Sequence, residues 1–526
     1  MTKRYYMMAA LLAVVSIANA QETYINDRLT ATDEVNGTAR YVGMGGAMGA
    51  LGADLSVISS NPAGIGLYRK SEVGLTFGAV VPKNTNGWNS NTTARTYGEN
   101  LARASFDQMG LVWNLKINSD VVKHVNIAAN YQKKANYNWG FYADNPTLGG
   151  LSQMDQIAEL ANAGFDTDYN LAGLALDNGF LSKDAQGIFN GYRGNSSQYT
   201  RHQRGSLKDF DFNISFNLKD RVYTGVTFGV TNADYLSWSS YSELNTDKAG
   251  NYGDYTLYND REIDGTGINV KLGLIVRPIE ESPFRIGLTM ETPTWYRMKS
   301  STLYDLTDNV DNVRTETFES YLEYTLRTPW RGRVSLGSTV DKVLAWGVEY
   351  EYANMAKTAM GYPTWEDDGY HNSFANTKDY AMNDLTKQTL RGQHTVKAGL
   401  EVKPIEEVAV RVGYNFVSKR YKDNPIFDQG YLDSYSMNYQ TSTDFMTLGA
   451  TNIATFGLGY KHKKFYADLS YKYRMQSGKF YAFDTSFARA GEPFAADYPE
   501  LANSTIRPVD LNLNRHQIQL SLGFKF

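Results

Sequence analysis

Apolar and polar residues alternate along most of the chain with a period of two. One run is Phe210, Phe212, Ile214, Phe216 and Leu218, separated by Asp, Asn and Ser. Successive side chains of a strand point to opposite faces, so each such run has one apolar face and one polar face. The pattern therefore predicts an all-β protein.

Runs of this kind occur at 72–81, 109–115, 121–133, 209–218, 221–231, 267–277, 284–291, 318–326, 330–340, 343–352, 393–402, 408–417, 453–460, 465–473 and 515–526. The number is odd, whereas a single-chain membrane barrel has an even number of strands. We therefore predict that 318–326 and 330–340 form one long strand, bent at Thr328-Pro329. Proline is tolerated at such a bend because no ladder hydrogen bond is needed there. Fourteen strands result.

Three features favour a membrane barrel over a soluble sandwich. The runs are about ten residues long, the length a tilted strand needs to cross a bilayer. The face opposite the apolar one carries charges, which suits a wet lumen. Turns are alternately short and long, as in porin-like barrels. The short turns are 118–120, 219–220, 278–283, 404–407 and 461–464, and the expected outer loops are 134–208, 232–266, 292–317, 353–392, 418–452 and 474–514.

The last run ends on an aromatic residue. Its alternating members are His516, Ile518, Leu520, Leu522, Phe524 and Phe526. An amphipathic strand with a terminal aromatic residue resembles the recognition signal of bacterial outer-membrane barrels. We therefore expect Phe526 to be an assembly signal, with the barrel-assembly machinery as a partner.

The N-terminus has the three parts of a secretory signal peptide. Lys3 and Arg4 precede an apolar run at 7–17, and Ala18-Asn19-Ala20 follows. The run is too short to span a bilayer, which takes about 20 apolar residues. Residues 1–20 are therefore predicted to be removed after Ala20, and the mature chain to leave the cytoplasm for the outer membrane.

Composition excludes several classes of protein. Among 526 residues, 52 Lys+Arg oppose 56 Asp+Glu, so the chain lacks the basic excess of a nucleic-acid binder. It has no cysteine, which excludes disulfides, thiolate metal sites and Cys nucleophiles. Its six histidines have no metal-ligand spacing, and its paired carboxylates lie in predicted turns. We expect no enzyme, no metal site and no cofactor.

Residues 40–67, RYVGMGGAMGALGADLSVISSNPAGIGL, do not alternate. Glycines let a backbone pack closely inside a lumen, and Asn-Pro fixes a local turn. Apolar surface comes from Met44, Met48, Leu51, Val57 and Ile58. Methionine adapts to varied ligand shapes. Two interpretations remain open, namely a plug alone and a plug that also forms a ligand site.

This segment resembles the N-terminal hatch of the long-chain fatty acid transporter family, also called the outer membrane protein transport family. The motif residues are Gly43, Gly45, Gly46, Asp54, Asn61, Pro62 and Ala63, directly before the first strand. Thr328-Pro329-Trp330 and the stretches HTVKAGLEV and VRVGYNF agree, so the resemblance runs from about residue 38 to the end. It implies a fourteen-stranded barrel plugged by a small hatch, divided into 1–20 (signal peptide), 21–70 (N-terminal extension and hatch) and 71–526 (barrel).

The resemblance also implies a function. Members pass hydrophobic molecules across the outer membrane, so we expect a passive, monomeric transporter for fatty-acid-like or other apolar compounds, surrounded by outer-membrane lipid. The ligand would be held near the five apolar hatch residues and released by hatch movement or sideways through the wall. The alternatives are a protein-interaction or secretion-shuttle barrel, and a haem receptor.

Two further patterns predict local structure. Residues 273–288 (GLIVRPIEESPFRIGL) and 399–414 (GLEVKPIEEVAVRVGY) echo each other, which predicts equivalent periplasmic hairpins. In the first long loop, Leu148, Leu151, Met154, Ile157 and Leu160 recur near helical spacing. This helix is expected either to offer a landing groove for an apolar substrate or to pack the loop onto itself.

Overall fold

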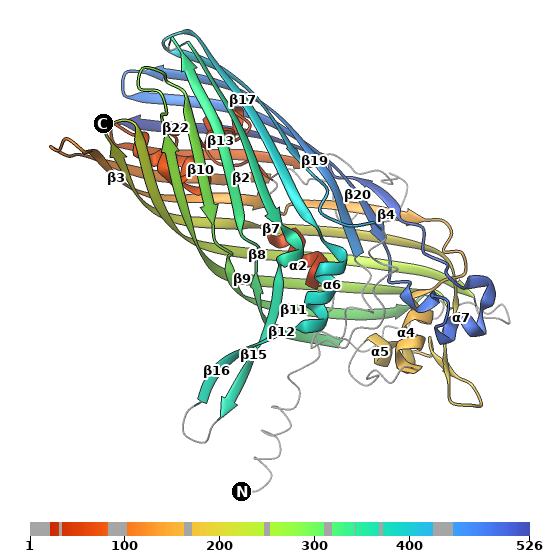
Figure 1. The fold of residues 1–526 in the computed structure, drawn as a ribbon. Helices are drawn as coiled ribbons and strands as arrows, with labels where there is room; N and C mark the ends of the chain where they lie inside the picture. Colours follow the sequence, from red (N-terminus) through yellow and green to blue (C-terminus); the bar gives the residue numbers. More distant parts are fainter. Residues whose placement is uncertain are drawn as a thin grey trace, which may run out of the picture.

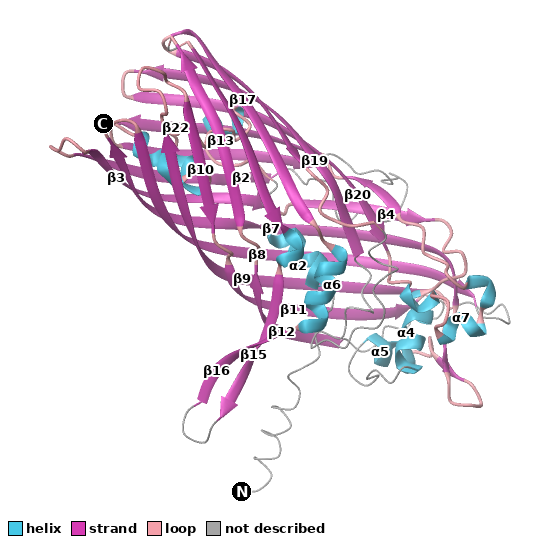
Figure 2. Cartoon of the chain, viewed as in Figure 1, coloured by secondary structure: helices cyan, strands magenta, loops and turns pink. Residues whose placement is uncertain are grey.

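The structure is a computed structural model that describes residues 22–30, 34–82, 103–162, 171–246, 253–309, 318–341, 343–367, 372–423 and 445–526. The predicted signal peptide, 1–20, lies outside the described residues. A long barrel of strands makes up most of the molecule, and its helices gather mainly in one half (Figures 1 and 2). None of the described helices is both long and apolar enough to cross a membrane.

The barrel is closed, antiparallel and fourteen-stranded. Its strands are β1 (Glu72–Pro82), β2 (Arg103–Lys116), β3 (Val122–Asn136), β7 (Arg193–Leu218), β8 (Val222–Thr246), β9 (Tyr255–Val276), β10 (Arg285–Glu291) continued by β11 (Trp295–Asp308), β12 (Phe318–Arg327) continued by β13 (Arg331–Val340), β14 (Leu344–Asn354), β17 (Gly392–Ile405), β18 (Val408–Val417), β19 (Phe445–His462), β20 (Phe465–Tyr481) and β22 (Arg515–Lys525). Pairing of β22 with β1 closes the ring. The predicted architecture and strand count are confirmed.

The predicted merger of two strands is also confirmed. β10–β11 and β12–β13 are neighbours, and both are interrupted beside a proline, Pro293 in one and Pro329 in the other. The amide of Thr328 donates to the carbonyl of Thr294 at 3.1 Å, and the amide of Thr294 donates to Thr328 Oγ1 at 2.8 Å. The two strands therefore bend together, and side-chain and backbone bonds bridge the break.

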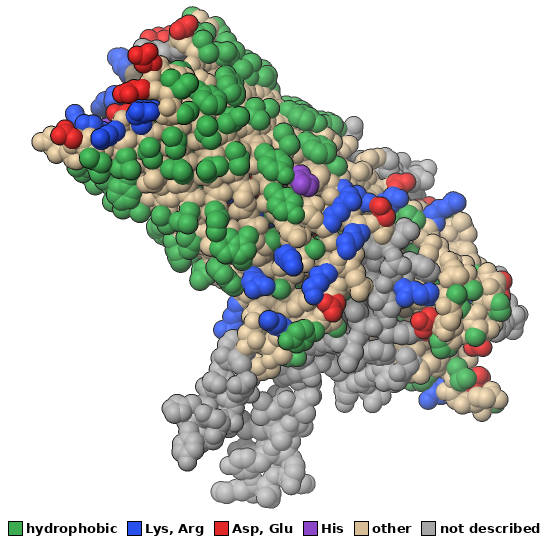
Figure 3. All heavy atoms as spheres, viewed as in Figure 1, with side chains coloured by type: hydrophobic (Ala, Val, Ile, Leu, Met, Phe, Trp, Pro, Cys, Tyr) green, Lys and Arg blue, Asp and Glu red, His purple; other side chains and the backbone are tan. Residues whose placement is uncertain are grey.

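Apolar side chains point outward on the barrel. On β7, Phe210, Phe212 and Ile214 are exposed, whereas Asp209 and Asp211 are buried in the lumen. Figure 3 shows the result as a broad hydrophobic band on the visible face of the half of the wall that ends in the short turns. An apolar exterior around a charged interior is stable only if the exterior faces lipid.

Several strands run well beyond their predicted ends. β7, β8 and β9 have 26, 25 and 22 residues, so much of 134–208 and 232–266, expected as outer loop, is strand. The apolar period stops at the edge of the hydrophobic band, and polar residues such as Asn232 and Asp234 take the outward positions. Beyond the bilayer a strand keeps its ladder but no longer needs an apolar outer face, so the pattern no longer marks it.

The outer end carries the remaining elements. They are β4 (Trp139–Asn145), α4 (Gln153–Asn162), α5 (Leu171–Asp177), β5 (Ser182–Lys183), β6 (Phe189–Asn190), η4 (Met355–Lys357), β15 (Ala359–Asp367), β16 (Asn372–Lys378), α6 (Tyr380–Thr389), η6 (Ser486–Ala488), α7 (Pro493–Asp497), η7 (Pro499–Leu501) and β21 (Val509–Asn512). Inside the barrel lie α2 (Glu22–Thr30), α3 (Ala39–Gly43), η1 (Leu55–Ser59) and η2 (Pro62–Leu67). The predicted apolar helix is α4, which contains Met154, Ile157 and Leu160, whereas Leu148 and Leu151 lie before its first turn. All five residues are buried, so they pack the outer end together.

The C-terminal residue takes part in closure. Phe526 exchanges two backbone hydrogen bonds with Ser71, at 3.0 and 3.1 Å, and its ring lies edge-on to Trp113, 6.2 Å away. We expect Phe526→Asp to lower the amount of folded barrel in outer membranes at least severalfold. The measurement is heat-modifiable migration of membrane fractions. Phe465→Asp, an equally lipid-facing change away from the terminus, is the control. Equal levels of the two variants would contradict a terminal signal.

Two buried carboxyls make the outer cap sensitive to pH. Burial, and then the charge of Asp497, raise the pKa of Glu159 on α4 to about 7, and burial raises the pKa of Asp484 to about 7. Both carboxyls have a pKa near 4 in an unfolded chain, so the folded cap binds these protons more tightly. The contribution of these two groups to its stability should therefore be greatest below about pH 4 and fall until about pH 7, by up to about 4 kcal/mol per group.

Amide hydrogen exchange in α4 and α7, corrected for its intrinsic pH dependence, should be slower at pH 5 than at pH 8. Glu159→Gln combined with Asp484→Asn should flatten the difference. Glu500→Gln, at an exposed carboxylate of the same cap, should leave it unchanged. A pH dependence that persists in the double variant would show that other groups cause it.

Candidate functional site

The hatch comprises residues 34–70. It consists of short helices whose first turns are capped. Asp54 caps η1 by accepting from the amide of Ser56 at 2.9 Å, and it also accepts from Thr38 Oγ1 at 2.8 Å. Asn61 caps η2 by accepting from the amide of Ala63, and its Nδ2 donates to the carbonyl of Gly49 at 2.8 Å. Capping satisfies backbone groups that so short a helix leaves unpaired. The Asp54 and Asn-Pro-Ala motif residues therefore fix the path of the hatch backbone.

One stretch of hatch backbone lies directly on glycines of the wall. Gly347, Gly399 and Gly413 are register neighbours on β14, β17 and β18. A Cβ on them would collide with the backbone of Ala47, Met44 and Gly45 respectively. Gly45 itself has φ +61°, a conformation that glycine adopts without strain. We call these three wall residues the glycine track.

The Asn-Pro-Ala motif is seated in the same way on a nearby part of the wall, formed by β8, β9 and β10. Gly225 and Gly273 are register neighbours on β8 and β9, and they touch Pro62 and Asn61. Gly287 on β10 lies against Asn61 and the carbonyl of Gly49.

The two echoing segments are the β9–β10 and β17–β18 hairpins, as predicted. The glycines that open and nearly close each segment, Gly273 with Gly287 and Gly399 with Gly413, all contact the hatch. Sequence reasoning missed this role, although the echo carried the signal.

Charged side chains complete the contact between hatch and wall. Arg40 of α3 pairs with Glu401 at 3.1 Å, and Arg411 joins Glu401 to Asp468 at 2.6 and 2.5 Å. Farther along the wall, Lys271 bridges Asp209 and Asp211, and Arg333 bridges Glu291 and Glu351. The lumen is therefore lined by mutually paired charges, which fix one arrangement of strands and hatch more than they add stability.

The five residues predicted to bind ligand lie inside the hatch. Met44, Met48, Leu51 and Val57 form one apolar cluster with Val35, Tyr41, Val42 and Ile453. Ile58 belongs to a second cluster with Leu55, Ile65, Tyr68, Val112 and Ala128. All five are at most 6% exposed, so in this arrangement they are the core of the hatch.

A much larger apolar cluster fills the outer half of the lumen. Its aromatic members include Tyr137, Phe141, Tyr199, Tyr241, Tyr255 and Phe480. Helix α2 lies within it through Ile25 and Leu29, and Asp27 anchors α2 to Arg420 and Tyr421 at 2.8 and 2.7 Å. The helical spacing of Leu148, Leu151, Met154 and Ile157 revealed only a part of this cluster, because its other members come from many separate strands and loops.

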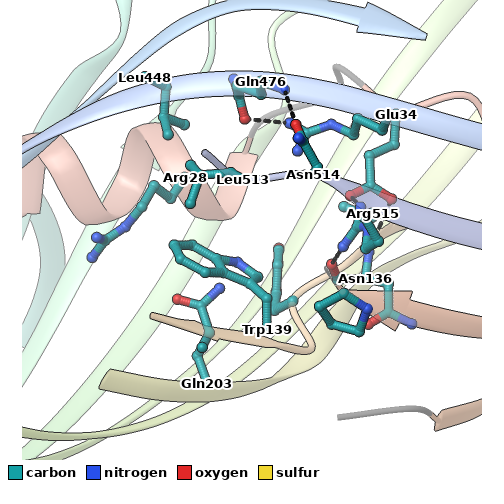
Figure 4. A pocket seen from close by; sticks show the side chains of 15 residues that line it. Arg28, Glu34, Asn136, Trp139, Gln203, Leu448, Gln476, Leu513, Asn514 and Arg515 are labelled. Carbon is teal, nitrogen blue, oxygen red and sulfur yellow. Dashed lines mark hydrogen bonds and ion pairs between the residues drawn. The ribbon is translucent and has the colours of Figure 1, made fainter. Parts of the chain in front are cut away.

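Among the described residues, which omit 83–102, the wall is interrupted beside this cluster. There β2 pairs with β3 only as far as Gln132, whereas β7 follows β3 and β4 to Asn145 on the other side. A cavity of about 70 Å³ lies at the break, bordered by Asn136, Trp139, Leu448 and Leu513 (Figure 4).

Arg515 ties the break together. It pairs with Glu34 of the hatch and donates to the carbonyl of Asn136 at 2.6 Å, and Glu34 accepts from the amide of Asn136. Figure 4 shows these three residues meeting at one side of the cavity. We call them the latch.

The glycine track predicts how the hatch can be loosened. Gly399→Val should drive the hatch off the wall, because the added carbons overlap backbone that cannot yield, at a cost of about 1–3 kcal/mol. The barrel should stay heat-modifiable, and its ion conductance in planar bilayers should rise. Gly332→Val, where a Cβ meets nothing within 4 Å, is the matched control. Wild-type conductance in Gly399→Val would contradict the seating described above.

The sequence matches no family model and no curated protein. Among solved structures it is similar to a Pseudomonas aeruginosa FadL homologue, with 12% identity, a TM-score of 0.51 and coverage of 93% of this chain and 98% of that one. It is also similar to the Ralstonia pickettii toluene transporter TbuX (12%, 0.49, 94% and 99%) and to the CymD monoaromatic hydrocarbon channel (11%, 0.49, 94% and 99%). The chain therefore has the outer-membrane barrel fold of a FadL homologue.

Proposed function

We propose that the protein is a passive outer-membrane transporter for hydrophobic small molecules, either fatty-acid-like or other apolar compounds. The observation that carries the proposal is the apolar cluster in the outer lumen, which stands above the hatch and beside a break in the wall. A water-filled pore has no use for such a lining, whereas an apolar ligand gains by leaving water for it.

The aromatic part of the cluster suits a ligand of this kind. Tyr199 stacks on Phe480 with ring centroids 4.4 Å apart, and Phe141 lies 5.4 Å from Tyr199. A bound apolar molecule would replace contacts between these rings with contacts between the rings and itself. The protein would therefore lose little packing energy on binding.

The latch is the proposed point of release. The cavity behind it, about 70 Å³, is smaller than a transported molecule, so passage needs the latch to part. Glu34 belongs to the hatch and Asn136 to the end of β3, where its pairing with β2 has stopped, so one movement would shift the hatch and open the wall. Motion of the hatch would also bring Met44, Met48, Leu51, Val57 and Ile58 into contact with ligand. The sequence has no phosphate-binding loop, so the proposed transport runs down a gradient or takes its energy from elsewhere.

A reversible cross-link tests this function. The chain has no cysteine, so Glu34→Cys with Arg515→Cys introduces the sole thiol pair. We expect cells carrying the protein to take up a radiolabelled fatty acid or toluene. Oxidation of the cysteine pair should reduce this uptake at least tenfold, and a reductant should restore it. Probe binding to the purified oxidised protein should persist, since the outer lumen is untouched.

The control pair is Phe465→Cys with Phe524→Cys, register partners on the outer wall whose rings lie 4.7 Å apart. Its oxidation should leave uptake unchanged. Uptake no faster than in cells without the protein would refute transport of these compounds. Normal uptake by the oxidised latch pair would refute release at this break.

A further inference from the structure

A second cavity lies on the outside of the barrel. Its volume is about 750 Å³, within the range of about 300–1,000 Å³ typical of small-molecule sites. One side of the cavity is formed by the barrel strands. There Ile268 on β9 is the register neighbour of Trp295 on β11, which is the register neighbour of Arg327 on β12. The rest is formed by η4, β15, β16 and one face of α6, through Tyr380, Asn383 and Lys387.

The lining is strongly basic. It contains Arg297, Arg327, Lys357, Lys378 and Lys387, and no Asp or Glu. Glu323 lies 3.7 Å from Arg297, and Asp384 lies 2.6 Å from Lys387, so two of the five charges have a carboxylate nearby. Among the described residues, no carboxylate is paired with the other three. The cavity therefore has an unbalanced positive charge.

The cavity sits where the hydrophobic band ends on the outer side. Ile268 and Trp295 are each 47% exposed and belong to the lipid-facing surface, whereas the next outward position on β11 is Arg297. Tyr380, 71% exposed, adds a second aromatic ring at this level. Figure 3 shows basic side chains gathered along this edge of the band, over the region of α6 and β11 in Figure 1. Aromatic and basic residues at this height face the headgroups of a bilayer.

We propose that this cavity binds the phosphorylated headgroup of a lipid in the outer leaflet. Arginine and lysine donate strong charge-assisted hydrogen bonds to phosphate oxygens. The apolar floor at Ile268 and Trp295 continues into the lipid-facing wall. The phosphate of a single lipid molecule would therefore contact the cations while its acyl chains lie against the apolar floor. A free phosphate would meet only the cations. This assignment goes beyond transport and does not depend on it.

A bound lipid would brace a weak part of the wall. β12 and β15 share only three residue pairs, from Thr325 to Arg327, before β15 turns away. Helix α6 packs beside this short pairing, against β15 and η4, with Met382 and Leu385 buried. The proposed ligand contacts β12, β15 and α6 together, so it would hold them in place.

The test uses the full-length protein in detergent. Wild-type barrels should gain thermal stability when micelles are doped with diphosphorylated lipid A, and no stability from the same lipid with its phosphates removed. Arg327→Gln with Lys357→Gln and Lys378→Gln should bind the phosphorylated lipid about a hundredfold more weakly, since each cation near an anionic surface contributes about fivefold.

The charge-matched control is Lys461→Gln with Lys463→Gln and Lys464→Gln, in the exposed turn between β19 and β20 at the periplasmic end. It should bind like wild type. Equal stabilisation of the wild type by both lipids would overturn the proposal without any variant. Wild-type affinity in the first triple variant, with its heat-modifiable migration intact, would overturn it as well.

Discussion

Closure of the strand ladder is the constraint on which the rest of this structure depends. Hydrocarbon offers backbone groups no hydrogen-bond partner, so the wall is stable only because β22 returns to pair with β1 along their whole shared length. Closure turns one face of every strand to lipid and the other to the lumen. The alternating pattern of the sequence follows from this. So do the ion pairs of the lumen, because charges enclosed by a wall must find partners within it.

A closed lumen must then be filled, and the hatch fills its periplasmic half by backbone contact. A chain with ordinary side chains on both surfaces could not approach as closely as Met44 approaches Gly399 or Pro62 approaches Gly225. The glycines on the wall and the caps at Asp54 and Asn61 therefore act together to let the hatch backbone pack closely on the wall. The first makes room for the hatch backbone, and the second holds that backbone in the shape that fits.

The sequence predicts the strands that an alternating pattern marks, and it misses the sites that are built from residues far apart in the chain. Alternation located all fourteen strands within the bilayer, and the parity of the count led to the bend at Pro329. It did not reach the outer parts of β7, β8 and β9, where no lipid enforces a pattern. The glycine track, the latch and the basic cavity each join residues far apart in the chain, and only the register brings them together. For the glycines a local signal did exist, since the echo between the two hairpins repeats their spacing.

The latch and the basic cavity share a physical origin. Within the described part of the chain, β3 has no pairing with β2 beyond Gln132 at the first, and β12 keeps β15 for only three residue pairs at the second. Where a ladder stops, the wall is held by side chains such as Arg515 or by a packed helix such as α6, and these contacts can exchange with a ligand as a continuous ladder cannot. A barrel whose wall must be sealed against lipid cannot open a continuous ladder. A site that admits a molecule through the wall is therefore expected where the ladder stops. The two proposed binding features therefore lie at the breaks, while the uninterrupted strands supply the rigid frame around them.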